Sequence, residues 1–187
     1  MYDVSDLRKG IKLLIDGAPW VVTDFEFSKP GKGQAIYNCK LKNMLNGTTM
    51  SRSYRSNDKF EKPDLSQRLV HFSYAVGDSY FFTDENYEQV EMSAETLGRD
   101  RFFLIEDMEC EVLYFSDEPI EVTLPNFVER KIIHCDPGAR GNTAAGKVTK
   151  PATIEGDYEL PVPLFVNEGD TIRVDTRNGE YVDRVRS

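Results

Sequence analysis

Ser28-Lys29-Pro30-Gly31-Lys32-Gly33-Gln34 separates two segments, 24–27 and 35–42, in which apolar and polar residues alternate. A period of two residues is typical of half-buried strands, so these segments predict a β-hairpin with residues 28–34 at its tip. Pro30 fixes its own φ angle, and the two glycines permit turn geometries that are closed to other residues. The sequence therefore predicts that Lys32 projects its amine from the body on a two-stranded stalk. A surface turn that carries solvated lysines is the alternative interpretation.

The rest of the chain reads almost entirely as short strands, which predicts an all-β protein. Turn signals such as Asp16-Gly17 and Asn46-Gly47 separate the strands of the N-terminal third. The polar stretch 57–64, which contains Pro63, predicts a domain boundary, and Pro125 opens the last unit. The expected domains are 1–63, 64–126 and 127–187.

Each domain is expected to be a small barrel. In the first, the strands are expected at Ile11–Ile15, Trp20–Val22, within the hairpin 24–42, and at Thr48–Tyr54. The second shows about five strands and one helical insertion, from Ala94 towards Asp107 with Ser93 as its N-cap and an interruption near Gly98, a pattern that fits an OB-type barrel. The third shows a long loop at Asp136–Lys150 and strands at Val128–Cys135, Ala152–Ile154, Leu164–Val166, Ile172–Asp175 and Tyr181–Val185.

The net charge of −9 is distributed unevenly along the chain. Residues 1–62 hold 11 Lys/Arg and 7 Asp/Glu, a net charge of +4, whereas residues 63–127 hold 3 and 15, a net charge of −12. Residues 128–187 hold 9 and 10 and are nearly neutral. The first third is therefore suited to phosphates, while the middle third should avoid them or meet a basic protein. Simple solubilisation of the middle domain is the alternative.

Several functional classes lack their signatures in this sequence. No nucleophile elbow or phosphate loop is present, and neither histidine has Cys, Asp or Glu at metal-ligand spacing, so we expect no enzyme, no metal and no cofactor. No apolar run is long enough to span a membrane, and the N-terminus lacks the layout of a signal peptide. The widely spaced Cys39, Cys110 and Cys135 predict reduced thiols in a cytoplasmic protein.

A series of sequence blocks resembles bacterial translation elongation factor P, the family that also includes the hypusine-containing factor of eukaryotes and archaea. The first blocks are the tip 29–35, Lys40-Leu41-Lys42-Asn43 and the turn Leu45-Asn46-Gly47. The later blocks are Leu124–Glu129, Asp136-Pro137-Gly138, Lys150–Thr153, Val162–Val166 and Asp175–Tyr181. The blocks follow the order of the family and span the chain, so chance is a poor explanation. The Pro-Gly-Lys-Gly tip favours the main branch of the family over a close paralogue with a different tip.

The resemblance implies an SH3-like (KOW-like) N-terminal barrel followed by two OB-type barrels, in an L-shaped, tRNA-like arrangement. It implies a cytoplasmic monomer that binds the ribosome between the peptidyl-tRNA and exit sites. There it would promote peptide-bond formation and relieve stalling at consecutive prolines, by positioning the CCA end of the peptidyl-tRNA. The implied partners are the ribosome, its RNA and the peptidyl-tRNA, together with a lysine-modifying ligase.

The resemblance also assigns roles to residues. Lys32 is expected to contact the peptidyl-tRNA and to be the residue that carries a β-lysyl or other modification, or none. The expected supporting residues of the tip are Lys29, Pro30, Gly31, Gly33 and Gln34, and the two glycines are expected to keep bulk away from Lys32 in a narrow RNA-lined passage. The candidates for contact with the RNA backbone are Lys40, Lys42, Arg140, Lys150, Arg177 and Arg184. Gly141, Asn142 and Thr143 stand where the family usually has Gly-Asp-Thr near the exit-site codon, so the codon readout there is open.

One alternative from another functional class remains. The chain could be a non-ribosomal module of tandem barrels that docks a basic protein partner through residues 63–127. Co-sedimentation with ribosomes separates the two hypotheses.

Overall fold

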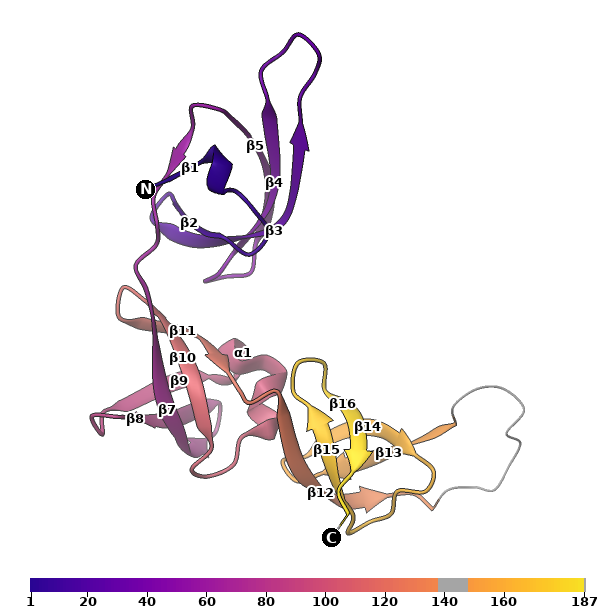
Figure 1. Ribbon diagram of the computed structural model, residues 1–187. Coiled ribbons are helices and arrows are strands. Elements are labelled where there is room, and N and C mark those ends of the chain that lie inside the picture. Colours follow the sequence, from indigo (N-terminus) through magenta and orange to yellow (C-terminus); the bar gives the residue numbers. More distant parts are fainter. Residues whose placement is uncertain (138–147, 187) are drawn as a thin grey trace. The chain divides into compact units, whose positions relative to one another are not determined.

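The computed structural model describes residues 1–137 and 148–186 (Figure 1). The chain forms two compact units. The first consists of Met1–Ser66 with Leu113–Ile120, and the second of Gln67–Val112 with Glu121–Ser187. Strands dominate both units, as the alternation of apolar and polar residues predicts.

The N-terminal part of the first unit is a curled β-structure. Its main sheet has the order β2-β3-β4-β5, and β1 pairs with β6. Its elements are β1 (Tyr2–Asp3), the 3-10 turn η1 (Val4–Asp6), β2 (Lys12–Ile15), β3 (Ala18–Ser28), β4 (Ile36–Asn43), β5 (Thr49–Arg55) and β6 (Lys59–Phe60). Leu13, Val22 and Leu41 are fully buried between the strands. Burying apolar side chains of this size stabilises each by about 1.5–3 kcal/mol, so alternate residues of the strands define this core.

A five-stranded sheet of order β11-β10-β7-β8-β9 follows along the chain. Its elements are β7 (Leu65–Val76), β8 (Ser79–Asp84), β9 (Gln89–Ser93), α1 (Ala94–Leu97), the 3-10 helix η2 (Gly98–Phe103), β10 (Glu109–Phe115) and β11 (Glu118–Thr123). The N-cap prediction is confirmed, because the Ser93 hydroxyl accepts a hydrogen bond from the Thr96 backbone at 3.1 Å. The interruption predicted near Gly98 is also confirmed, because Gly98, with a φ of 55°, ends the α-helix. The 3-10 helix that continues it ends at Phe103, so the helical stretch stops short of Asp107.

The last sheet has the order β14-β13-β12-β15-β16. Its strands are β12 (Phe127–Cys135), β13 (Thr149–Ile154), β14 (Tyr158–Pro163), β15 (Thr171–Asp175) and β16 (Glu180–Arg184). The strand predicted at Leu164–Val166 was wrong: these residues lie in a turn, in which the Val166 amide donates to the Pro163 carbonyl at 3.1 Å. The true strand β14 holds two prolines, which argue against a strand in sequence. The fold accepts them because β14 lies at one end of the order of its sheet.

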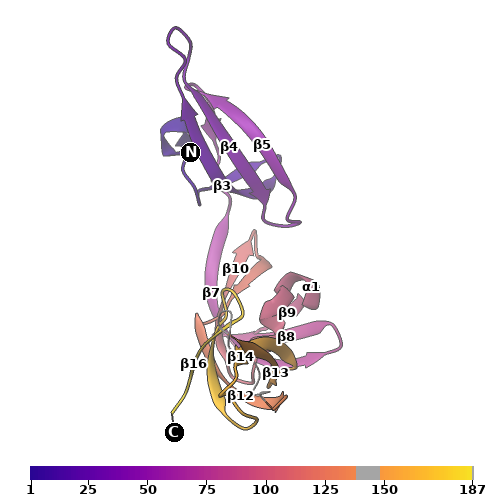
Figure 2. The same cartoon turned by 90° about the vertical axis from the view of Figure 1, so that its right-hand side faces the viewer.

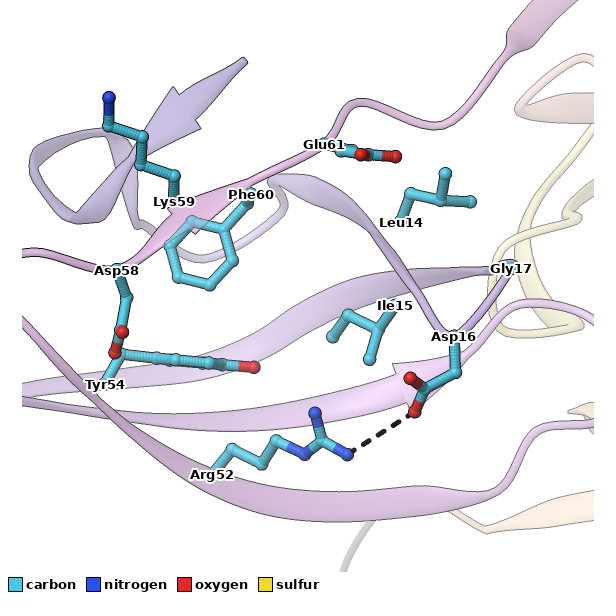
Figure 3. Close-up of a pocket in the computed structure, with 10 residues that line it drawn as sticks. All are labelled: Leu14, Ile15, Asp16, Gly17, Arg52, Tyr54, Asp58, Lys59, Phe60 and Glu61. Carbon is cyan, nitrogen blue, oxygen red and sulfur yellow. Dashed lines mark ion pairs between the residues drawn. The ribbon is translucent and has the colours of Figure 1, made fainter.

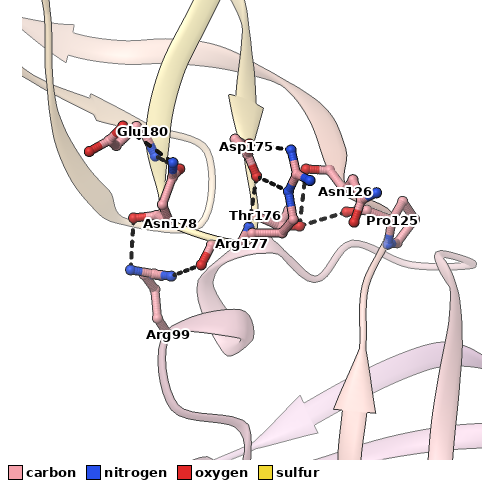
Figure 4. Close-up of polar contacts among 8 residues, drawn as sticks. All are labelled: Arg99, Pro125, Asn126, Asp175, Thr176, Arg177, Asn178 and Glu180. Atoms are coloured by element: carbon pink, nitrogen blue, oxygen red, sulfur yellow. Dashed lines mark hydrogen bonds and ion pairs between the residues drawn. The ribbon is translucent and has the colours of Figure 1, made fainter. Parts of the chain in front are cut away.

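Within the second unit, the segment that follows α1 packs against the last sheet. The Arg99 guanidinium donates to the backbone carbonyls of Arg177 and Asn178, both at 2.8 Å (Figure 4). The ring of Phe103 meets Tyr158 edge-on with a centroid separation of 4.9 Å. Ring contacts and charge-assisted hydrogen bonds of this kind are specific in geometry. These contacts hold most of the second sheet and the third sheet in one compact unit, although the two sheets belong to different predicted domains.

Arg130 is part of the same contact and is only 4% exposed. One guanidinium nitrogen donates to the Glu129 carbonyl at 2.7 Å, and another donates to the Phe103 carbonyl. Burial lowers the pKa of Arg130, and the charge of Glu155 opposes that shift. A buried cation needs such partners, because removing its charge from water otherwise costs on the order of several kcal/mol.

The three cysteines differ in accessibility. Cys39 and Cys110 are each 2% exposed, while Cys135 is half-buried, and all three are free thiols. Burial raises the pKa of Cys110 to about 12, with smaller contributions from the charges of Asp100 and Glu109. Burial also raises the pKa of Cys39. The thiolate is the reactive form, so both buried thiols should be protected.

We expect iodoacetamide at about pH 8 to modify Cys135 before Cys39 and Cys110. Peptide mapping by mass spectrometry after a timed quench measures the order of reaction. The control is the protein unfolded in denaturant, in which all three thiols should react. Modification of Cys110 in the native protein as fast as Cys135 would contradict the burial argument.

Candidate functional site

The β3–β4 hairpin extends past the rest of its sheet (Figures 1 and 2). The last pairs of β3 with β4 are Phe27 with Tyr37 and Ser28 with Ile36. β5 ends beside Ile36, which pairs with Arg55. Residues 29–35 therefore lie beyond the last paired positions, and residues 28–34 are all exposed. The predicted hairpin and the exposure of its tip are confirmed.

The tip closes in a four-residue turn, in which the Gly33 amide donates to the Pro30 carbonyl at 2.9 Å. Gly31 and Lys32 occupy the two central positions of this turn. Among the described residues, the Lys32 ammonium group has no ion pair and no hydrogen bond. The turn thus presents a free primary amine at the end of the stalk.

Of the two roles expected for the glycines, special turn geometry is wrong and absence of bulk beside Lys32 remains. Neither Gly31 nor Gly33 has a φ angle in the left-handed region, so the turn does not use backbone geometry closed to other residues. A Cβ at Gly31 would meet nothing within 4 Å, and one at Gly33 would lie 3.0 Å from Pro30 Cγ. What both glycines give the tip is the absence of side chains beside Lys32.

Aromatic rings cover one side of the stalk. Tyr37 meets Phe27 edge-on at a centroid distance of 5.1 Å and Phe25 at 6.2 Å. Phe27 is 53% exposed although it lies in the paired part of the strand. Cross-strand aromatic pairs each stabilise a hairpin by about 0.2–1 kcal/mol, so these rings hold the base of the tip in one register.

Basic side chains follow the opposite face of β4. Lys40 lies opposite Asp24, with 3.6 Å between Nζ and the carboxylate, and both side chains are largely exposed. Surface ion pairs of this kind contribute about 0–1 kcal/mol, so Lys40 stays available to another anion. Lys42 is exposed two residues further along β4. Sequence reasoning missed Arg55, which is exposed beside Ile36 at the tip end; the alternation along β5 could have indicated it.

The basic residues predicted to contact RNA from the last domain differ in exposure. Arg177 forms two contacts with the Asp175 carboxylate, at 3.0 and 2.8 Å, and Arg184 lies 3.4 Å from Asp170. Both arginine side chains are exposed, at 60% and 41%. The placement of Lys150 on a loop was wrong: it lies in β13 and is 6% exposed, because Thr149 already opens that strand. Arg140, Gly141, Asn142 and Thr143 lie outside the described residues.

A pocket of about 530 Å³ lies beside β5 and β6 (Figure 3). Its rim carries both signs of charge, including Asp16 and Arg52, which form an ion pair at 3.7 Å. Its lining holds no histidine and no cysteine.

In residues 1–137 and 148–186, no three His, Cys, Asp or Glu side chains gather as metal ligands would. In the same part of the chain, no helix has the length and apolar character needed to cross a bilayer.

Three family models match consecutive parts of the chain. Residues 3–60 match the elongation factor P KOW-like domain, residues 65–122 match the elongation factor P OB domain, and residues 128–184 match the elongation factor P C-terminal domain. Together they leave only short segments unmatched. These matches support the predicted order of domains, an SH3-like barrel followed by two OB-type barrels.

Curated relatives and a solved structure agree with these matches. Elongation factor P of Desulfotalea psychrophila is 49% identical, and that of Syntrophus aciditrophicus is 46% identical, each over the full length of both chains. The solved structure of eukaryotic translation initiation factor 5A from Methanococcus jannaschii has a TM-score of 0.54 at 23% identity. It covers 66% of this chain and 91% of that chain, and shows a shared fold. The chain belongs to the elongation factor P family of translation elongation factors.

Proposed function

We propose that the protein binds the ribosome between the peptidyl-tRNA and exit sites and promotes peptide-bond formation where consecutive prolines stall translation. The observation that carries this proposal is the Lys32 amine, free and exposed at the end of a narrow stalk with no side chain on either neighbour. Such a tip fits a role in which a cation enters a confined RNA-lined space. The amine would contact the CCA end of the peptidyl-tRNA.

The proposed mechanism works through orientation. The ring of proline fixes its φ angle and constrains its secondary amine, so consecutive prolines hold the reacting groups in unproductive geometries. A positioned cation that contacts the phosphate and ribose groups of the tRNA end favours the reactive pose. A tenfold gain in rate requires only about 1.4 kcal/mol. The protein thus needs no nucleophile or base of its own.

The exposed basic side chains of the stalk would contribute contacts that do not depend on RNA sequence. Lys29 lies at the tip, and Lys40, Lys42 and Arg55 lie on the strands that lead to it. Arg177 and Arg184 would act in the same way from the last domain, once each exchanges its carboxylate for a phosphate. Phosphate contacts position a protein on RNA without reading its sequence. Gly141, Asn142 and Thr143 remain candidates for contact near the exit-site codon.

The test of the proposal is a reconstituted translation system that reads a template with consecutive prolines and a matched template without them. We expect the protein to accelerate synthesis on the first template only, and to co-sediment with ribosomes. A protein that neither co-sediments with ribosomes nor changes the rate on the proline template would instead favour a non-ribosomal binding module.

Lys32, and not Lys29, is expected to be the modified residue in the native host if either lysine is modified. Gly31 and Gly33 leave the Lys32 amine accessible to a modifying ligase, whereas Lys29 precedes a proline, which restricts it to extended backbone nearer the stalk. Peptide mapping of protein purified from the native host locates any added mass. An added mass on Lys29 alone would contradict the assignment.

A further inference from the structure

Tyr74, Phe81 and Glu91 form a row across β7, β8 and β9 on the outward face of the sheet. The register pairs Tyr74 with Phe81 and Phe81 with Glu91, and paired residues share a face. The neighbours Phe72 and Phe82 point into the core, where they are 8% and 0% exposed. The row therefore lies on the surface of the barrel.

The two rings of this row form a fixed aromatic platform. Tyr74 and Phe81 are stacked, with ring centroids 4.8 Å apart and an interplanar angle of 26°. The Gln89 side-chain amide donates to the Tyr74 hydroxyl at 2.8 Å, which holds the tyrosine ring in place. Tyr74 is nevertheless 48% exposed. A stacked pair that packing does not cover offers its faces to a ligand.

The third member of the row supplies a positioned carboxylate. One Glu91 oxygen accepts a hydrogen bond from the Ser79 hydroxyl at 2.6 Å, and the side chain is exposed. Its second oxygen has no hydrogen bond to any described residue. An aromatic face next to a held carboxylate matches a guanidinium group, which stacks on rings and donates hydrogen bonds in its plane.

The charge of the surrounding segment favours the same ligand. Residues 63–127 carry 15 Asp/Glu against 3 Lys/Arg, and those three basic side chains already have partners within the chain. Arg99 donates to carbonyls of the last sheet, Arg101 lies 4.5 Å from the ring centroid of Phe102, and Arg68 also has a partner. Exposed carboxylates on the strands and turns of this sheet remain, among them Glu85, Glu88, Glu109 and Glu111.

This arrangement reverses the usual use of an OB-type strand face. OB folds that bind oligonucleotides combine aromatic platforms with a basic groove. Here the aromatic platform is present, but the segment around it carries a negative net charge, which repels phosphates. We propose that the Tyr74–Phe81–Glu91 face docks an arginine side chain in a basic segment of a partner protein. This role is separate from that of the Lys32 tip.

The test measures binding of a hexa-arginine peptide to the full chain by calorimetry at about 50 mM salt, where charge contacts are only partly screened. A hexa-lysine peptide serves as the comparison. We expect tighter binding of the arginine peptide, because only guanidinium stacks on the rings while it contacts Glu91. Tyr74→Ala and Glu91→Gln should each weaken arginine binding by about tenfold.

Matched variants separate the platform from general charge. Tyr74→Phe keeps the ring and should bind like the parent, and this variant also shows that the sheet tolerates loss of the Gln89 contact. Tyr87→Ala, at a turn tyrosine that is 91% exposed, should leave binding unchanged. Glu88→Gln removes one of the surrounding charges and should weaken binding far less than Glu91→Gln. Equal affinity for both peptides, or equal losses in Glu88→Gln and Glu91→Gln, would mean that only net charge acts and would overturn the proposal. Binding of a uridine decamer that Tyr74→Ala abolishes would overturn it in favour of RNA.

Discussion

Lys32→Ala is expected to abolish relief of stalling at consecutive prolines and to leave the fold intact. The side chain is exposed and makes no ion pair or hydrogen bond with the described residues, so its removal should change the free energy of unfolding by less than about 0.5 kcal/mol. Its loss removes the cation that is proposed to hold the CCA end. The measurement is the rate of peptide-bond formation on a consecutive-proline template, with a loss of at least about tenfold.

The control for this experiment is Lys29→Ala. Lys29 has the same charge and lies in the same exposed tip, but it sits before Pro30 and not at the centre of the turn. It should lower ribosome affinity slightly through one lost phosphate contact and should retain the proline-specific rate. Full activity of Lys32→Ala would refute the role proposed for the tip, whereas equal losses in both variants would show that the tip contributes only charge.

Gly156→Ala should produce the largest loss of stability among single alanine substitutions of the glycines. Gly156 has a φ of +95°, and a Cβ there would lie 2.2 Å from the Phe102 carbonyl oxygen. The clash is with backbone and cannot be relieved by a rotamer change. The expected loss of unfolding free energy is about 3 kcal/mol, from the strained φ and the forced separation of η2 from the last sheet. Urea unfolding followed by circular dichroism measures it.

Gly169→Ala is the matched control, because Gly169 has a similar φ of +89° and an added Cβ would meet nothing within 4 Å. It should lose only the conformational term of about 1 kcal/mol. Trp20, the single tryptophan of the chain, lies in β3 of the first unit, so its fluorescence serves as an internal reference. Equal losses in the two glycine variants would refute the close contact with Phe102.

The sequence predicted most strands, but it failed at two places in the last domain for a common reason. The strand Tyr158–Pro163 was missed because Pro161 and Pro163 lack the backbone N–H that a strand normally donates. The missing donors would disrupt a central strand, which pairs on both sides, but β14 lies at one end of its sheet and pairs on one side. Lys150 was predicted to end the loop Asp136–Lys150, but strand β13 begins at Thr149 and the Lys150 side chain is buried. Position within a sheet decides both cases, and a single sequence does not contain it.

The candidate site was predicted more completely than the packing around it. The alternation on either side of residues 28–34 is a local property, so strand pairing and the exposure of Lys32 follow from it directly. Of the two roles predicted for Gly31 and Gly33, the special turn geometry was wrong, because glycine is compatible with many turns and only the folded chain shows which one forms. The alternation along β5 could have indicated that Arg55 is exposed, but its position beside the tip depends on the register of β5 with β4.

By itself, the sequence determined the all-β class, the hairpin with its lysine tip, and the contrast between a basic first third and an acidic middle third. Each of these follows from near neighbours in the chain or from composition. The family was identified in a different way, by the resemblance of sequence blocks along the chain to elongation factor P. Only the tertiary structure decided that Arg99 and Phe103 join two predicted domains in one unit, and that Tyr74, Phe81 and Glu91 lie in one row. The Arg99 contacts join residues 78 and 79 positions apart in the chain. The row depends on strand register, including the irregularity of β7 between Phe72 and Tyr74. Burial and register exist only once the strands have paired.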